Sequence, residues 1–177
     1  NGCVALAMAT TGIAANLLEL GRTFHSRLKA PLDPTEDSTL QISNQSQLAE
    51  LIRRAKILVI DEATMLDKFS LEALERSLRD IMQSPNLPFG GKVLVLSGDF
   101  RQCLPVVPGA NRAETVAQCI NKSHLWQHFS VYQLTKNLRV RATGDQEKEY
   151  FDRWTLSIRN KMNENGRVSI PEAMLTK

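Results

Sequence analysis

The chain has 177 residues, enough for one domain with a hydrophobic core, or for one domain and the start of another. Hydrophobic residues make up 42% and charged residues 23%, so disordered and fibrous classes are excluded. No apolar run approaches the roughly 20 residues of a membrane helix. The three cysteines are too few for a disulfide framework and are interpreted as reduced intracellular thiols. The formal net charge of +3 permits a polyanionic partner without requiring one.

Short apolar runs alternate with segments of helical periodicity along the chain. Four runs predict strands, at residues 3–8, 57–60, 93–96 and 131–134. The second and third are continuously apolar, which is typical of strands buried on both faces of a parallel sheet. Helices are predicted at 48–55, at 71–82 with Ser70 as N-cap, and near 116–120. The alternation predicts an α/β fold with a parallel sheet flanked by helices.

Two polar stretches interrupt this pattern. Residues 31–47 are rich in Pro, Asp, Ser, Thr and Asn and predict a surface loop. A second break falls at residues 141–145, and a helix-like stretch follows at 150–158. We expect this tail to begin a second domain.

Adjacent carboxylates follow the strand predicted at residues 57–60. Ligands bind at the carboxyl ends of the strands in open parallel sheets, so Asp61 and Glu62 are placed where a nucleotide could bind. Asp61 could hold Mg²⁺, directly or through water, and Glu62 could act as a general base, as in a Walker B motif. A polar pair at a strand exit is the alternative interpretation.

The strand predicted at residues 93–96 ends in a similar way. Gly98 allows close backbone approach, and Asp99, Arg101 and Gln102 follow it. The Gln102 amide could bind a γ-phosphate or the attacking water. A turn is the alternative, because Gly-Asp is common in turns.

Small and hydroxyl residues follow the first predicted strand, at residues 9–15. They predict a corner that could bind an anion at a helix start, and a nucleic-acid phosphate fits better than a nucleotide because no G-x-x-x-x-G-K-[ST] loop is present. Simple N-capping is an equally weighted alternative.

The order and spacing of these motifs resemble the PIF-type DNA helicases of superfamily one, most closely the relatives carried by Helitron-like transposons. The resemblance rests on these segments: Ala9–Ala15, Gly21–Ser26, Asp61–Ala63, Pro88–Lys92, Gly98–Val106, Leu134–Arg139 and, more weakly, Ile170–Leu175.

The resemblance implies a RecA-like P-loop NTPase lobe. Residues 1–140 would form a partial first helicase domain without its P-loop strand, and residues 141–177 a linker and the start of the second. Asp61 would coordinate Mg²⁺, Glu62 would activate water, and Gln102 and Arg139 would contact the γ-phosphate of ATP.

The same resemblance implies contacts with single-stranded DNA and duplex junctions. Thr11, Gly12, His25 and Ser26 would touch the single-stranded backbone, and the clustered Arg22, Arg27 and Lys29 are well placed to meet phosphate. The implied activity is ATP-dependent 5′–3′ unwinding in DNA repair, recombination and telomere maintenance. The implied location is the nucleus, with the mitochondrion as the alternative, and the chain is expected to be neither secreted nor membrane-bound.

The Walker A loop of the family is missing from this sequence, which opens with Asn1. We therefore expect a cut just after the phosphate loop, and an isolated chain that binds ATP poorly and hydrolyses none. Two other hypotheses are a catalytically dead, transposon-derived module that holds DNA or a partner, and a different P-loop ATPase. The motif at residues 9–15 and the His25 segment argue against the last.

Overall fold

The computed structural model describes residues 4–135, 138, 150–151, 153–156, 158 and 170. The chain divides into two compact units, Asn1–Ser130 and Val131–Lys177. In the second unit the described residues between 150 and 158 are helical, as predicted. The domain boundary predicted after residue 140 falls outside the described residues and stays a prediction.

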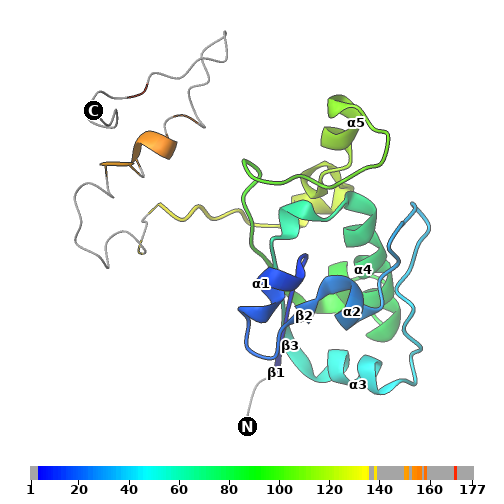
Figure 1. The fold of residues 1–177 in the computed structure, drawn as a ribbon. Coiled ribbons are helices and arrows are strands. Elements are labelled where there is room, and N and C mark those ends of the chain that lie inside the picture. The colour runs from blue at the N-terminus through cyan, green and yellow to red at the C-terminus, as the bar shows by residue number, and fades with distance from the viewer. Residues whose placement is uncertain are drawn as a thin grey trace. The chain divides into compact units, whose positions relative to one another are not determined.

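A four-stranded parallel sheet organises the first unit (Figure 1). Its order is β2-β1-β3-β4. The strands are β1 (Val4–Ala9), β2 (Arg22–Thr23), β3 (Ala55–Asp61) and β4 (Val93–Leu96). Three of the predicted strands and the parallel α/β class are therefore confirmed.

The fourth predicted strand, at residues 131–134, is wrong. These residues are exposed and belong to no strand, because no neighbouring backbone pairs with them. The sheet instead gains β2, whose two residues pair with Met8 and Ala9 of β1. Arg22 and Thr23 carry no apolar pattern, so periodicity could not indicate this strand.

Five α-helices and four short 3₁₀ helices lie in the described part of the first unit. The α-helices are α1 (Gly12–Asn16), α2 (Phe24–Leu28), α3 (Gln47–Arg54), α4 (Lys68–Ile81) and α5 (Arg112–Ala117). The 3₁₀ helices are η1 (Ala63–Met65), η2 (Pro88–Gly91), η3 (Ile120–Lys122) and η4 (His124–His128). No helix among the described residues is long and apolar enough to cross a membrane.

Helix α4 begins three residues earlier than predicted. Its N-cap is Asp67, whose carboxylate accepts hydrogen bonds from the Ser70 backbone N–H at 2.8 Å and from the Ser70 hydroxyl at 3.0 Å. Ser70 is a buried residue of the first turn. The ionised carboxylate satisfies the free N–H groups of the helix start, so the sequence-predicted cap was misplaced by one turn.

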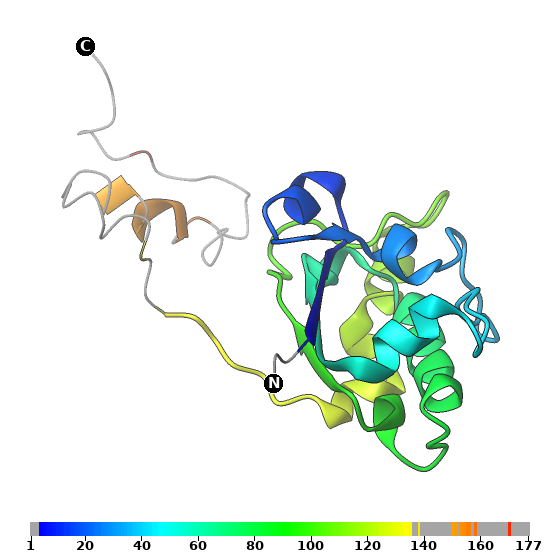
Figure 2. The ribbon, with the colours of Figure 1, turned by 90° about the horizontal axis from the view of Figure 1, so that it is seen from below.

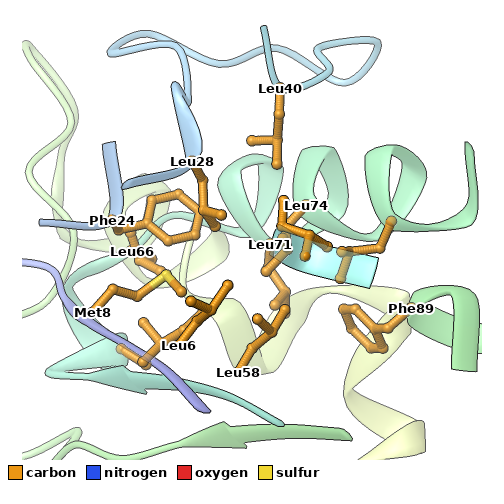
Figure 3. Close-up of a cluster of buried hydrophobic side chains, with 14 of the residues drawn as sticks. Leu6, Met8, Phe24, Leu28, Leu40, Leu58, Leu66, Leu71, Leu74 and Phe89 are labelled. Carbon is orange, nitrogen blue, oxygen red and sulfur yellow. The ribbon is translucent and has the colours of Figure 1, made fainter. Parts of the chain in front are cut away.

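The hydrophobic core lies on one face of the sheet. Leu6, Met8 and Leu58 meet side chains of α2 and α4 there (Figure 3). The two-faced burial predicted for strand 93–96 is wrong, because Val93 and Val95 are 58% and 42% exposed. In strand 57–60, Leu58 and Ile60 are buried and Ile57 and Val59 are half-buried, so the prediction holds there in part. The reason is that α2, α3 and α4 all lie on the same side of the strands (Figure 2).

The predicted loop at residues 31–47 contains no strand, and α3 begins at its last residue. It is nevertheless tied to α4. The Leu40 side chain is buried, its backbone N–H donates to the Ser77 hydroxyl at 2.8 Å, and Arg76 donates twice to the Ser38 carbonyl. These contacts hold the loop against the helix that follows the Asp61–Glu62 pair.

Candidate functional site

The carboxyl ends of the four strands bring the predicted site segments to one edge of the sheet. Ala9 of β1 pairs with Thr23 of β2 on one side and with Asp61 of β3 on the other. Ile60 pairs with Leu96 of β4. The order along the edge is therefore the His25 segment, the Thr11 segment, the Asp61–Glu62 pair and the segment after Leu96.

Asp61 and Glu62 form the centre of this edge. The Asp61 Oδ1 atom accepts hydrogen bonds from the Glu62 backbone N–H at 3.0 Å and from the Ser97 hydroxyl. Glu62 has φ 52° and ψ 34°, a left-handed conformation that is uncommon for residues with a side chain. Both side chains are half-buried. The backbone turn thus presents two carboxylates side by side at the end of a buried strand.

Thr10 holds this turn from the neighbouring strand. Its hydroxyl donates to the Glu62 carbonyl at 2.8 Å, and its backbone N–H donates to the Asp61 carbonyl at 3.0 Å. Thr10 and Ser97 were not predicted as site residues. Their common signal is a hydroxyl residue directly after a parallel strand, where it can reach the end of the next strand.

The segment after β4 continues the edge. Hydrogen bonds from the Arg101 backbone and then from its side chain lower the pKa of Asp99, with a smaller contribution from the Gln102 side chain. The Arg101 side chain also forms an ion pair with Asp99, at 3.0 Å between Nε and Oδ1. Gln102 is exposed. The Gln102 backbone N–H donates to the Asp99 carbonyl at 2.9 Å, which closes the predicted turn. The turn therefore exists, and it presents the Gln102 side chain to solvent.

Gly98 packs against Thr64 of η1. A Cβ at Gly98 would stand 3.0 Å from the Thr64 side chain, closer than an ordinary van der Waals contact, so glycine favours this close approach. The Thr64 hydroxyl is buried without a hydrogen-bond partner among the described residues. This contact sets the spacing between the turn after β3 and the turn after β4.

The Asp61 carboxylate is chemically suited to hold the Mg²⁺ ion that the family resemblance implies. Mg²⁺ is commonly held by one or two protein carboxylates, with substrate phosphates and water completing its octahedron. Oδ1 of Asp61 is oriented by two hydrogen bonds, while Oδ2 has no hydrogen-bond partner among the described residues. The same part of the chain contains no cluster of three His, Cys, Asp or Glu side chains that could bind a metal without substrate.

Thr11 and Gly12 lie at the start of α1. The Thr11 hydroxyl accepts a hydrogen bond from the Ala14 backbone N–H at 3.3 Å, so the N-cap interpretation is correct. Gly12 is exposed, and a Cβ there would meet nothing within 4 Å. Both residues are open to a partner at the edge, and their DNA contact stays a prediction.

His25 and Ser26 lie on the first turn of α2, beside the Thr11 segment. Ser26 is exposed, and its backbone N–H donates to the Thr23 hydroxyl at 3.3 Å. Burial lowers the pKa of His25, and the negative charge of Asp67 opposes that effect. The lowered pKa favours the neutral imidazole of His25, which could donate one ring N–H to a phosphate oxygen.

The predicted site is only partly assembled. Arg139 lies outside the described residues, so its predicted γ-phosphate contact stays a prediction. Within the described residues, no hydrogen bond joins Gln102 to Asp61 or Glu62. Among the described residues, those predicted to bind nucleotide lie towards β3 and β4, and those predicted to contact DNA lie towards β2 and β1.

Comparisons with known proteins agree with this arrangement. The profile of the PIF1-like helicase family matches residues 1–168. The chain is 38% identical over 106 residues to ATP-dependent DNA helicase PIF1 of Emericella nidulans, covering 59% of this chain and 14% of that protein. It is 36% identical over 121 residues to ATP-dependent DNA helicase RRM3 of Saccharomyces cerevisiae, covering 67% of this chain and 16% of that protein.

Solved structures of Pif1 helicases share the fold. The crystal structure of the Bacteroides Pif1 helicase in complex with ADP-AlF3 and ssDNA superimposes with a TM-score of 0.73 at 28% identity, covering 90% of this chain and 37% of that one. A structure of Pif1 helicases unwinding forked dsDNA gives the same TM-score at 27% identity, covering 94% of this chain and 40% of that one.

The chain thus spans only 14% and 16% of the length of these two curated relatives. The sheet order, the paired acids after β3 and the family match over residues 1–168 lead to one conclusion: the chain belongs to the PIF1-like helicase family.

Proposed function

We propose that this chain is part of the motor of an ATP-dependent 5′–3′ DNA helicase, which couples ATP hydrolysis to movement along single-stranded DNA and to unwinding. One observation supports the proposal. The strand register puts Asp61 and Glu62 on the same sheet edge as the Thr11 and His25 segments, and Thr10 donates hydrogen bonds to the carbonyls of Asp61 and Glu62.

The residues would divide the work as follows. Asp61 would hold Mg²⁺, which supplies charge neutralisation at the phosphates when ATP is bound. Glu62 would accept the proton of the attacking water, and Gln102 would sense the γ-phosphate. Arg139 would contact the same phosphate.

The DNA half of the edge would bind the sugar-phosphate backbone. Thr11 and Ser26 offer hydroxyl donors, Gly12 lets a strand approach the backbone closely, and His25 offers a neutral ring N–H. Support comes from the Bacteroides relative, which was solved with ssDNA and ADP-AlF3, and from the forked-dsDNA complex. Single-stranded DNA, duplex junctions and ATP are the proposed partners.

The cellular processes and the location are proposed from the family resemblance alone. The proposed processes are DNA repair, recombination and telomere maintenance, and the proposed location is the nucleus, with the mitochondrion as the alternative.

The test replaces Glu62 by Gln in the full-length gene product. Loss of a general base should lower DNA-stimulated ATP turnover by about 10²-fold or more, while DNA affinity stays within about twofold. Glu50→Gln is the matched control, since Glu50 is an exposed residue of α3 whose loss should change neither quantity.

Forked duplexes with a 5′ or a 3′ tail test the polarity. Unwinding of the 5′-tailed fork alone is expected, and unwinding of the 3′-tailed fork alone would contradict the polarity. Normal turnover in the Glu62→Gln protein would refute the role of Glu62. A wild-type protein that binds DNA but hydrolyses no ATP would favour the binding-module hypothesis.

A further inference from the structure

A charged pocket lies on the flank of α4, outside the sheet-edge site. Its volume is about 370 Å³, at the low end of ligand pockets. Four of its lining side chains are cationic or can become so: Lys68, Arg76, Lys122 and His124. Glu36, Phe69 and Glu72 complete the lining. Small-molecule pockets are mostly apolar, so this lining suits an anion better than an apolar ligand.

A buried carboxylate fixes the wall of the pocket. Glu72 is 7% exposed, and its Oε1 atom accepts a hydrogen bond from the Ser123 hydroxyl at 2.6 Å. The Nδ1 atom of His124 lies 3.4 Å from the same oxygen. Ser123 also caps η4 by accepting from the Leu125 backbone N–H at 3.3 Å. These contacts tie the η3–η4 segment to α4, so the cations stand on a defined surface.

Three of the cations lack carboxylate partners. Among the described residues, Lys68, Arg76 and Lys122 take part in no ion pair. The Lys68 ammonium lies 5.0 Å from the centre of the Phe69 ring, and Arg76 donates to the Ser38 carbonyl, so the partners of both groups are uncharged. Glu36 is the one exposed acid in the lining. The three cations Lys68, Arg76 and Lys122 outnumber the two acids of the lining by one, so the pocket carries a small net positive charge.

Helix α4, which lines the pocket, shares a core with α2, which carries the proposed DNA residues His25 and Ser26. Lys68 directly follows Asp67, whose negative charge raises the pKa of His25 against the effect of burial. In the shared core, Phe24 and Leu28 lie near Leu71 (Figure 3). A strand that contacts His25 and Ser26 could thus reach Lys68 by continuing along the start of α4.

We propose that this pocket binds a backbone phosphate of DNA next to the phosphate contacted by α2, with Lys68 and Lys122 as its principal charges. The pocket would extend the DNA path from the sheet edge onto the flank of α4. The inference rests on the proposed function in assuming that the edge at α2 meets DNA. A phosphate fits because it is a compact anion that several converging donors can share.

The test measures the binding of a labelled single-stranded oligonucleotide to the full-length gene product over a salt series. Each lost phosphate contact on a single strand should reduce the slope of log K against log salt by about 0.7. Lys68 and Lys122 share one phosphate in this proposal, so the double substitution Lys68→Gln and Lys122→Gln should lower the slope by about 0.7. The matched control is Arg54→Gln with Lys56→Gln. These exposed cations lie at the end of α3 and the start of β3, at the opposite end of the strand from Asp61. The control should leave the slope unchanged.

A second variant separates the two proposals. Arg22→Gln removes an exposed cation beside the DNA half of the edge and should lower the slope by about 0.7. If Arg22→Gln lowers the slope and the Lys68 and Lys122 double variant does not, the pocket inference is wrong and the proposed DNA edge stands. If the control lowers the slope as much as the double variant, general charge explains the loss and the inference is wrong. If the unsubstituted full-length protein binds no DNA, the proposed edge and the inference both fail.

Discussion

The backbone of Glu62 is held in an unfavourable left-handed conformation by its neighbours. A left-handed backbone at a residue with a side chain costs of order 1 kcal/mol and persists only when its surroundings hold it. The hydrogen bond from Thr10 to the Glu62 carbonyl is one such restraint. Because Thr10 immediately precedes Thr11, the same residue stands between the proposed base and the proposed DNA contact.

Thr10→Val should therefore weaken the chemistry more than the fold. Valine keeps the shape of threonine but removes the donor, so the free energy of unfolding should fall by about 1 kcal/mol. In the full-length gene product, ATP turnover should fall several-fold more than DNA affinity, because the Glu62 turn loses its restraint. Chemical denaturation and steady-state ATPase assays measure the two effects.

Thr115→Val is the control for this prediction. Thr115 also donates its hydroxyl to a carbonyl, that of Asn111 at 3.0 Å, but it lies on α5, outside the sheet edge. It should lower stability without lowering turnover. Equal effects of the two substitutions on turnover would contradict a special role for Thr10.

At the scale of elements, the segment Pro88–Lys92 fixes the entry into β4. Gly90 has φ +60°, and a Cβ there would stand 2.5 Å from the Leu78 carbonyl oxygen of α4. Lys92 donates to the carbonyls of Arg53 and Ala55 at 2.7 Å each, which joins the end of α3 to the start of β4. This part of the family resemblance therefore corresponds to packing that sets the position of the segment ending at Gln102.

Gly90→Ala should destabilise the first unit by about 2–4 kcal/mol. The cost of a left-handed alanine and the cost of the clash with the Leu78 carbonyl add together. Gly109→Ala separates these causes: Gly109 has φ +72°, but a Cβ there would meet nothing within 4 Å. It should cost only about 1–2 kcal/mol. Denaturant unfolding compares them, and equal losses would show that the contact with α4 contributes nothing.

Sequence patterns predicted the elements that local chemistry determines. The apolar runs of β1, β3 and β4 and the periodicity of α3 and α4 are local signals, and they led to the correct parallel class. The acids after β3 were placed at the sheet edge by the same logic. What failed depends on partners distant in the sequence: β2 exists only through its pairing with β1, and residues 131–134 lack any such partner.

The site residues that local patterns indicate were predicted, whereas the contacts between distant residues were not. Residue types at strand ends indicated Asp61, Glu62 and Gln102, but no local pattern could indicate that the Thr10 hydroxyl reaches Glu62, 52 residues away. The left-handed turn at Glu62 and the orphaned Thr64 hydroxyl likewise arise from packing between neighbouring strands. The predicted contacts of Arg139 lie outside the described residues.

At the scale of the whole molecule, the sheet of the first unit is covered unequally. The helices that form the core lie on one face, and on the other face β4 exposes Val93 and Val95 to 58% and 42%. Strand β4 is also the edge of the described sheet. An exposed apolar strand at an edge favours association between chains, because its free backbone groups and side chains can both pair.

We therefore expect the 177-residue chain to self-associate as its concentration rises, and Val93→Lys with Val95→Lys to shift it towards the monomer. Charged edge residues disfavour pairing with a second strand, and both side chains point away from the core, so the midpoint of unfolding should change little. Sedimentation velocity over a concentration series measures the shift. Val106→Lys is the control, because Val106 is 89% exposed but lies outside the strands. If the Val106 change dissociates the chains as well as the β4 changes do, added charge and not the β4 edge governs association.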